Sequence, residues 1–169
     1  LDEMVGQLVK LKKEYRTYQR YANSKFEDVF PNKKLMGSER LQSVSFESVF
    51  LENKKSGKFV IKKLPVDLQM SPIQSFALDD FNHDGITDLI AGGNFYANQI
   101  NIGKCDASYG HLLTLKNDNG ELKWKTLSLL ESGFAIDGEV RDIKILKGEG
   151  DKKFVLVSKN NENLDLFSF

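Results

Sequence analysis

A nine-residue stretch, residues 80–88, carries the side chains of this sequence that are best suited to chemistry. Residues with side-chain oxygens stand at its first, third, fifth and ninth positions: Asp80, Asn82, Asp84 and Asp88. Gly85 and Ile86 stand at the sixth and seventh positions. Ca²⁺ takes about six to eight oxygen ligands, mostly carboxylates, carbonyls and waters. Alternate side chains point inward as a backbone wraps an ion, while Gly85 permits a sharp turn and Ile86 would contribute its carbonyl oxygen. The spacing therefore predicts a calcium-binding loop whose three carboxylates come close to neutralising the ion.

Other ions and loop types fit these residues less well. An EF-hand needs a bidentate Glu at position 12 and a helix on each side, but position 12 is Ala91 and apolar, strand-like residues flank the loop. Zinc is disfavoured because His83 stands at an outward position without a second His or Cys at ligand spacing. Magnesium is disfavoured because it usually keeps several waters. A solvated Asp/Asn turn that holds no ion is the remaining alternative.

The composition of the 169-residue chain excludes several classes of protein. Apolar residues make up 40% of the chain and charged residues 28%, which is enough apolar material for a core and excludes intrinsic disorder. Lys plus Arg and Asp plus Glu both number 24, so the zero net charge is unlike that of a strongly basic nucleic-acid binder. No apolar run approaches the roughly 20 residues that span a bilayer. The single cysteine, Cys105, excludes an intrachain disulfide.

From about Ser43 onward, apolar residues recur with a period of two, as is typical of β-strands. The acidic loop joins two of these strands, and residues 117–120, which end in Asn119 and Gly120, are a strong hairpin signal. No helical period separates the strands, so the sheets should be antiparallel. We expect nine strands, at residues 45–53, 58–64, 75–80, 88–91, 111–116, 121–127, 139–146, 153–159 and 164–169.

The predicted hairpins repeat at a displacement of about 63 residues. Residues 49–59 resemble residues 112–122, and residues 75–91 match residues 139–157 more loosely. A period of this length suits a four-stranded unit with one long insertion, here residues 93–109. The strands would then be the last two of one unit, all four of a second and the first three of a third. We therefore predict a mainly-β fold of antiparallel β-propeller blades, about two to three of them, over residues 43–169.

Residues 1–36 carry a helical pattern instead. Their apolar residues recur at steps of three and four, which predicts one long amphipathic helix that packs on the rest of the protein or binds a partner: Met4, Leu8, Leu11, Tyr15, Tyr18 and Ala22. Ser24 followed by Glu27 is a capping-box pattern that predicts a short second helix, ended by Pro31. We expect residues 1–36 to form a separate N-terminal helical segment, which is also a candidate to cover open blade faces.

Residues 76–90, which contain the acidic loop, resemble the FG-GAP/VCBS repeat, the calcium-loop blade of integrin-α-like propellers. Residues 92–96, 106–110 and 138–143 look like the C-terminal region of cartilage-acidic-protein homologues of Bacteroidetes, which are large exported proteins with a UnbV-type segment. The resemblance implies that the loop binds calcium through Asp80, Asn82, Asp84, Ile86 and Asp88. Residues 147–151 depart from the pattern where a second loop would fall, so we expect one calcium ion rather than two.

An enzymatic site is hard to assemble from the remaining residues. His83 lies in the acidic loop and His111 at a strand start, and neither belongs to a nucleophile motif. Asp79 and Asp80 point to opposite faces of a strand, and Cys105 has no visible activating partner. We therefore expect no catalytic residues. The alternative is that the chain is part of a glycan-acting enzyme whose catalytic residues lie on missing blades.

These patterns together predict a non-catalytic, calcium-stabilised module of an exported bacterial protein at the cell surface or in the periplasm, which binds a ligand or acts as a scaffold. The chain opens at Leu1 without a signal pattern, so we expect a trimmed product or a fragment, with the remaining propeller blades in a longer chain. The insertion carries polar residues that would suit a glycan or peptide ligand, although long polar insertions are more often plain surface: Asn94, Tyr96, Asn98, Gln99 and Asn101.

Overall fold

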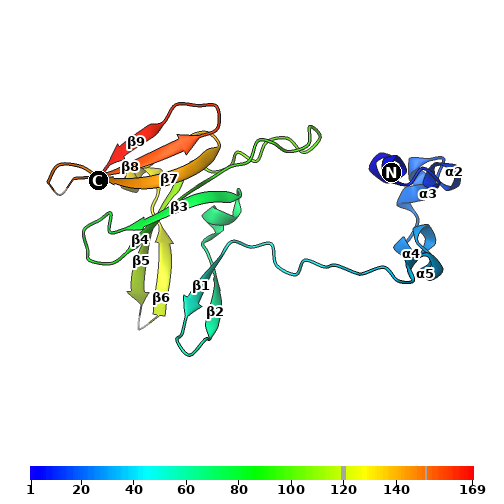
Figure 1. Ribbon diagram of the computed structural model, residues 1–169, viewed down its shortest axis with the longest axis horizontal. Coiled ribbons are helices and arrows are strands. Elements are labelled where there is room, and N and C mark those ends of the chain that lie inside the picture. The colour runs from blue at the N-terminus through cyan, green and yellow to red at the C-terminus, as the bar shows by residue number, and fades with distance from the viewer. Residues whose placement is uncertain (119–120, 151) are drawn as a thin grey trace. The chain divides into compact units, whose positions relative to one another are not determined.

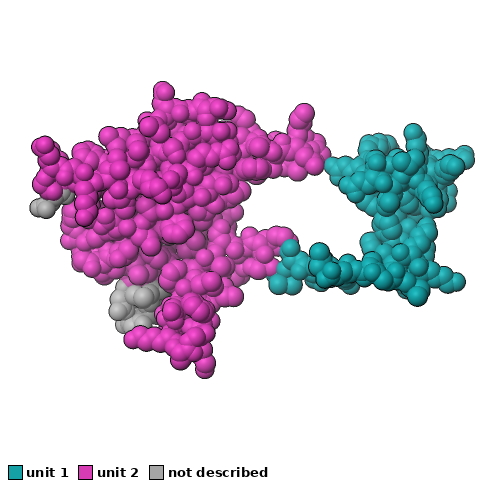
Figure 2. Space-filling model, viewed as in Figure 1, with its two compact units in different colours: residues 1–44 teal, residues 45–169 magenta. Residues whose placement is uncertain are grey.

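The computed structural model describes the backbone of residues 1–118, 121–150 and 152–169, and the side chains of these residues except 117, 118, 121 and 122. The chain divides into two compact units, residues 1–44 and residues 45–169 (Figure 2). The first unit is helical and the second is built mainly of β-strands (Figure 1). None of the helices in the described residues has both the length and the apolar character that crossing a membrane requires.

The N-terminal unit, all of whose residues are described, contains five short helices. They are α1 (Asp2–Gln7), α2 (Leu11–Glu14), α3 (Tyr18–Ala22), α4 (Phe26–Val29) and α5 (Asn32–Leu35). The prediction of one long helix is therefore wrong. The backbone leaves helical geometry at Leu8 and again at Tyr15, and two residues of the predicted stripe, Leu8 and Tyr18, are exposed.

A small core of its own explains why this unit folds back on itself. Leu11, Tyr15 and Val29 are buried together, although 14 residues separate the last two along the chain. Tyr15 also packs edge-on against Tyr21, with ring centroids 5.5 Å apart. Contacts of this kind need bends between short helices, whereas a single straight helix would need an external surface for its stripe.

The helix that the sequence places after Ser24 is present, but its cap differs. The N-cap of α4 is Lys25, whose backbone N–H donates to the Asp28 carboxylate at 2.9 Å. Ser24 instead donates its hydroxyl to the carbonyl of Arg20 at 2.8 Å. The predicted Ser24–Glu27 capping box is thus wrong by one residue.

The described part of residues 45–169 forms nine strands in three antiparallel sheets. The first sheet pairs β1 (Val49–Asn53) with β2 (Phe59–Lys63). The second is a meander of β3 (Ile73–Asp79), β4 (Asp88–Gly93), β5 (His111–Asp118) and β6 (Glu121–Thr126). The third contains β7 (Val140–Lys147), β8 (Lys153–Lys159) and β9 (Asp165–Ser168).

The sequence therefore predicts the strands of this unit well. All nine expected strands are present with bounds within four residues, and the predicted grouping of two, four and three is confirmed. The mainly-β class is confirmed as well. Asn119 and Gly120 of the predicted turn, and Asp151 of the segment expected to lack a second calcium loop, lie outside the described residues.

The four-stranded sheet has apolar packing on both faces, although Phe76 and Leu78 of its edge strand β3 stay largely exposed on the second face. On one face it shares the main core with the third sheet, through Ala77, Ile90, Leu112, Val140, Ile143, Val155 and Val157. On the other face, Leu89, Ala91 and Leu113 surround Leu68. On that side of the unit, Phe50 of β1 also packs edge-on against Trp124 of β6, with ring centroids 5.9 Å apart. The central strand β4 is buried along its whole length, in keeping with the absence of charged residues from it after Asp88.

Two short helical elements between the strands are absent from the sequence-based prediction. A 3₁₀ helix, η1 (Val66–Gln69), follows Pro65 and carries Leu68 into the core. The helix α6 (Leu129–Ser132) begins at Ser128, whose hydroxyl accepts from the backbone of Glu131, and ends at Gly133 in the left-handed conformation. The Ser128–Glu131 spacing and Gly133 are local signals from which α6 was predictable.

Polar contacts also join the second and third sheets. The Ser75 hydroxyl donates to Asp142 at 3.2 Å and accepts from the backbone N–H of Ile143 at 3.1 Å. Lys153 on β8 lies 2.6 Å from the carboxylate of Asp79 on β3. This ammonium group, together with the backbone N–H of Asp80, lowers the pKa of the Asp79 carboxyl.

Lys153→Met should lower the free energy of unfolding by about 1 kcal/mol, because the Asp79 pair is partly shielded and joins two sheets. Urea denaturation measures the loss. Lys144→Met is the matched control, since Lys144 pairs with Asp142 on its own strand and keeps 68% of its side chain exposed, against 31% for Lys153. We expect a loss of only about 0.2 kcal/mol for the control. Equal losses of unfolding free energy in the two variants would show that the position of Lys153 between the sheets adds nothing to stability.

Candidate calcium-binding loop

The acidic loop connects β3 to β4, and the sheet holds both of its ends. The two strands stay paired up to Asp79 and Asp88, which are partners in the register. Phe81, the second loop residue, is buried in the main core and packs against Phe169, with ring centroids 5.0 Å apart. The backbone at the start and end of the loop is thus fixed by pairing and packing that involve no ion.

Inside the loop, the side-chain oxygens turn onto the loop's own backbone. Asp80 accepts from the backbone N–H of Asp84 at 3.1 Å and of Gly85 at 2.9 Å. Asn82 accepts from the same Asp84 N–H at 2.9 Å, and Asp84 accepts from the N–H of Ile86 at 2.8 Å. Asp80 and Asn82 therefore meet at one amide, as the alternating spacing predicts for residues that share an interior.

The turn itself depends on two residues with positive φ. Gly85 has φ of 81° and His83 has φ of 59°. A Cβ atom at Gly85 would meet nothing within 4 Å, so the restriction there is conformational rather than steric crowding. The predicted role of Gly85 as the turn residue is confirmed.

Asp88 differs from the other loop residues in its burial. Its side chain is 0% exposed, one carboxylate oxygen accepts from the Phe81 N–H at 3.2 Å, and the other has no hydrogen-bond partner. Burial, assisted by the negative charges of Asp84 and Asp80, raises the pKa of the Asp88 carboxyl, and the backbone N–H groups of Phe81 and Asn82 oppose this rise only in part. A buried, unpaired carboxylate oxygen is costly, and a cation beside it would offset that cost.

The described residues hold no group of three or more His, Cys, Asp or Glu side chains arranged as a ready-made metal site. Amide N–H groups of the loop occupy Asp80, Asn82 and Asp84, so a cation would have to share or displace these hydrogen bonds. Ile86 takes part through its N–H, and its role as a carbonyl ligand stays a prediction. The loop residues fit calcium by their oxygen chemistry and by the unpaired oxygen of Asp88.

The insertion that follows β4 contains a buried polar network that the sequence did not suggest. Asn94 is 1% exposed, and its side-chain oxygen accepts from the Ser71 hydroxyl and the Ser108 N–H. Its side-chain nitrogen donates to the carbonyls of Ser108 and Gly138. Asn94 therefore anchors the insertion and is not placed to contact a ligand. In the sequence, the Gly-Gly pair before Asn94 is the local signal of a close approach between backbones at this point. A Cβ at Gly93 would lie 2.1 Å from the Pro72 carbonyl oxygen.

Two other polar residues of the insertion also have partners within it. Asn98 donates its side-chain nitrogen to the Cys105 sulfur at 3.1 Å. The Lys104 ammonium lies 4.4 Å from the centroid of the Tyr96 ring. These contacts favour plain structural roles for these residues over a prepared glycan or peptide site.

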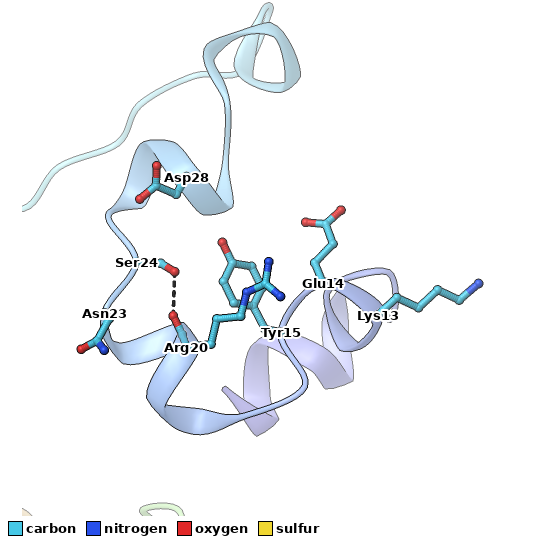
Figure 3. Close-up of a pocket in the computed structure, with 7 residues that line it drawn as sticks. All are labelled: Lys13, Glu14, Tyr15, Arg20, Asn23, Ser24 and Asp28. Carbon is cyan, nitrogen blue, oxygen red and sulfur yellow. Dashed lines mark hydrogen bonds between the residues drawn. The ribbon is translucent and has the colours of Figure 1, made fainter.

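A separate polar depression of about 530 Å³ lies in the N-terminal unit (Figure 3). Its lining combines two basic and two acidic side chains with an aromatic ring and two small polar groups: Lys13, Arg20, Glu14, Asp28, Tyr15, Asn23 and Ser24. The Arg20 guanidinium lies 5.9 Å from the centroid of the Tyr15 ring. The lining contains no pairing of a nucleophile with a base, so it presents no recognisable catalytic arrangement.

A scan against protein-family models finds no match to this chain, and searches of curated proteins and of solved structures find no significant match either. The similarity of residues 76–90 to the FG-GAP/VCBS repeat accordingly stays an interpretation of the sequence. The case for calcium therefore depends on the geometry of the loop and on Asp88.

Proposed function

We propose that the chain is a non-catalytic, calcium-stabilised module that binds a ligand or acts as a scaffold in an exported bacterial protein. The observation that carries the proposal is the fully buried carboxylate of Asp88, whose second oxygen lacks a hydrogen-bond partner at the end of an oxygen-rich loop. A dication bound beside Asp80, Asn82 and Asp84 would supply that partner. The ion would also tie the end of β3 to the start of β4, so its expected role is structural.

The arrangement of the sheets supports the wider proposal of propeller blades. Three antiparallel sheets, of two, four and three strands, follow one another along the chain, and apolar side chains pack between neighbouring sheets. Propellers typically close with about four to eight four-stranded blades. The proposal therefore implies further blades supplied from outside residues 1–169, and an unidentified protein or glycan as the ligand.

An extracellular or periplasmic location suits the type of site proposed. Calcium modules of extracellular proteins bind with dissociation constants of about 10⁻⁴–10⁻³ M, which matches the calcium concentration outside cells. A site with few carboxylates and a loop that is already hydrogen-bonded belongs in this weak range. The proposed location outside the cytoplasm therefore depends on the proposed calcium site.

Equilibrium dialysis against radioactive calcium tests the proposal directly. We expect about one ion per chain with a dissociation constant of about 10⁻⁴–10⁻³ M. Asp80→Ala should abolish binding because Asp80 accepts two of the hydrogen bonds that shape the loop interior. Asp137→Ala removes an exposed carboxylate outside the loop and should leave binding unchanged.

Absence of calcium binding, or equal binding by Asp80→Ala, would contradict the metal site. The non-catalytic part of the proposal has its own test. Purified chain incubated with a panel of polysaccharides should show capture at most, and release of reducing sugar would contradict it.

A further inference from the structure

The third sheet holds the acidic loop at the two residues that flank Asp80. Asp79, before it, accepts from the Lys153 ammonium of β8 at 2.6 Å. Phe81, after it, is 7% exposed and packs on Phe169, the residue that follows β9, with ring centroids 5.0 Å apart. The Phe169 N–H in turn donates to the Lys153 carbonyl at 3.1 Å, so both contacts come from neighbouring positions of one sheet. Asp80, the first predicted calcium ligand, therefore lies between two residues that the third sheet holds.

Phe81 also connects this contact to the far end of the loop. Its backbone N–H donates to a carboxylate oxygen of Asp88 at 3.2 Å. The other carboxylate oxygen of Asp88 is buried and lacks a hydrogen-bond partner. A displacement of Phe81 would therefore move the neighbour of Asp80 and, at the same time, the donor that orients Asp88. Through Phe81, the ring of Phe169 thus acts on the positions of the first and the last predicted ligands.

We propose that Phe81 and Phe169 position the ligands of the calcium site, so that calcium binding and the packing of the third sheet on the second sheet stabilise each other. The inference rests on the proposed calcium site and gives the ion a role beyond joining β3 to β4. A contact that holds ligands in place raises affinity, because less ordering is needed when the ion binds. The effect is reciprocal, since the contact must raise calcium affinity by the same factor by which calcium strengthens the contact.

The third sheet also supplies a matched control for this contact. Phe167 and Phe169 are both partly buried, and both pack against the main core. Phe167 packs on Phe134, with ring centroids 4.7 Å apart, whereas Phe169 lies 6.3 Å from Phe134 and 5.0 Å from Phe81. Truncation of either ring removes packing of the third sheet, but truncation of Phe169 also removes the contact with the loop.

The calcium affinity of folded variants tests the proposal. Equilibrium dialysis against radioactive calcium gives the dissociation constants, and circular dichroism shows that each protein is folded. We expect Phe169→Ala to raise the dissociation constant about fivefold and Phe167→Ala to leave it unchanged. Phe169→Leu keeps an apolar side chain against Phe81 and should recover most of the affinity. Urea denaturation supplies a second measurement, because Phe169→Ala should lose more unfolding free energy in calcium than in EDTA.

The unmodified chain separates this proposal from the one on which it rests. If the unmodified chain binds no calcium, the calcium site and the coupling both fail. If it binds calcium and folded Phe169→Ala binds equally well, the coupling alone is overturned and the site stands. Equal weakening by Phe167→Ala would also overturn the coupling, since general loosening of the third sheet would explain it.

A second variant keeps the test decisive if Phe169→Ala does not fold. Phe81→Leu reduces the same contact from the side of the loop and should also raise the dissociation constant. In a protein that carries both Phe81→Leu and Phe169→Leu, the two effects should not add, because both substitutions act on one contact. An unchanged calcium affinity in Phe81→Leu would overturn the coupling.

Discussion

Calcium at about 10 mM should raise the melting temperature of the chelator-treated protein by about 3–10 °C. The expectation follows from mass action. A ligand at about 10 to 100 times its dissociation constant stabilises the folded state by about 1.4–2.7 kcal/mol, and each kcal/mol shifts the melting of a chain of this size by a few degrees. Differential scanning fluorimetry or calorimetry measures the shift, with the protein first freed of ions by EDTA.

The variants of the loop make this result specific. Asp84→Ala should lose the shift, because Asp84 both orders the loop through the Ile86 N–H and supplies a predicted ligand. Asp67→Ala, which removes an exposed carboxylate outside the loop, should keep it. Magnesium at the same concentration should give a smaller shift, since it keeps its waters more tightly. A shift of equal size in Asp84→Ala would assign the effect to general screening of charge and not to this loop.

Local signals explain why the strands were predictable. A period of two and turn residues between the runs are properties of neighbouring residues, so they predict β1 to β9 without knowledge of distant contacts. The helical stripe of residues 1–36 is a local signal as well, but it predicts a helix without saying where the helix ends. The ends of the helices depend instead on the burial of Tyr15 against Val29, which is a contact between residues far apart in the sequence.

Some features of the predicted calcium loop likewise have local causes, and others depend on distant residues. Spacing alone predicts that Asp80, Asn82 and Asp84 turn toward one interior, and their hydrogen bonds to nearby amides agree. The burial of Asp88 depends on Phe81 and on the neighbouring sheets, which spacing does not reveal. The same holds for Asn94, whose partner Gly138 lies 44 residues away. Sequence reasoning therefore identifies the members of the loop, Asp88 included, but not the burial of Asp88 on which the energetics of the loop depend.

Asp88→Asn should change the stability in opposite directions with and without calcium. In chelator, the substitution removes a buried charge whose second oxygen is unpaired, while an oxygen remains to accept from the Phe81 N–H. We expect the melting temperature to rise by a few degrees, equivalent to about 1 kcal/mol. In calcium, the unmodified protein gains the free energy of binding and the variant lacks one charged ligand, so the variant should melt at a lower temperature than the unmodified protein.

The sign change separates a metal ligand from an ordinary structural carboxylate. Melting curves of both proteins in EDTA and in calcium supply the four values needed. Asp142→Asn is the control, because its carboxylate is about half exposed and lies outside the loop, and its effect on stability should be the same in both media. Destabilisation by Asp88→Asn of equal size with and without calcium would show that Asp88 serves only to hold the start of the loop through Phe81. The carboxylate would then need a different explanation for its burial, and calcium would lose its main physical support.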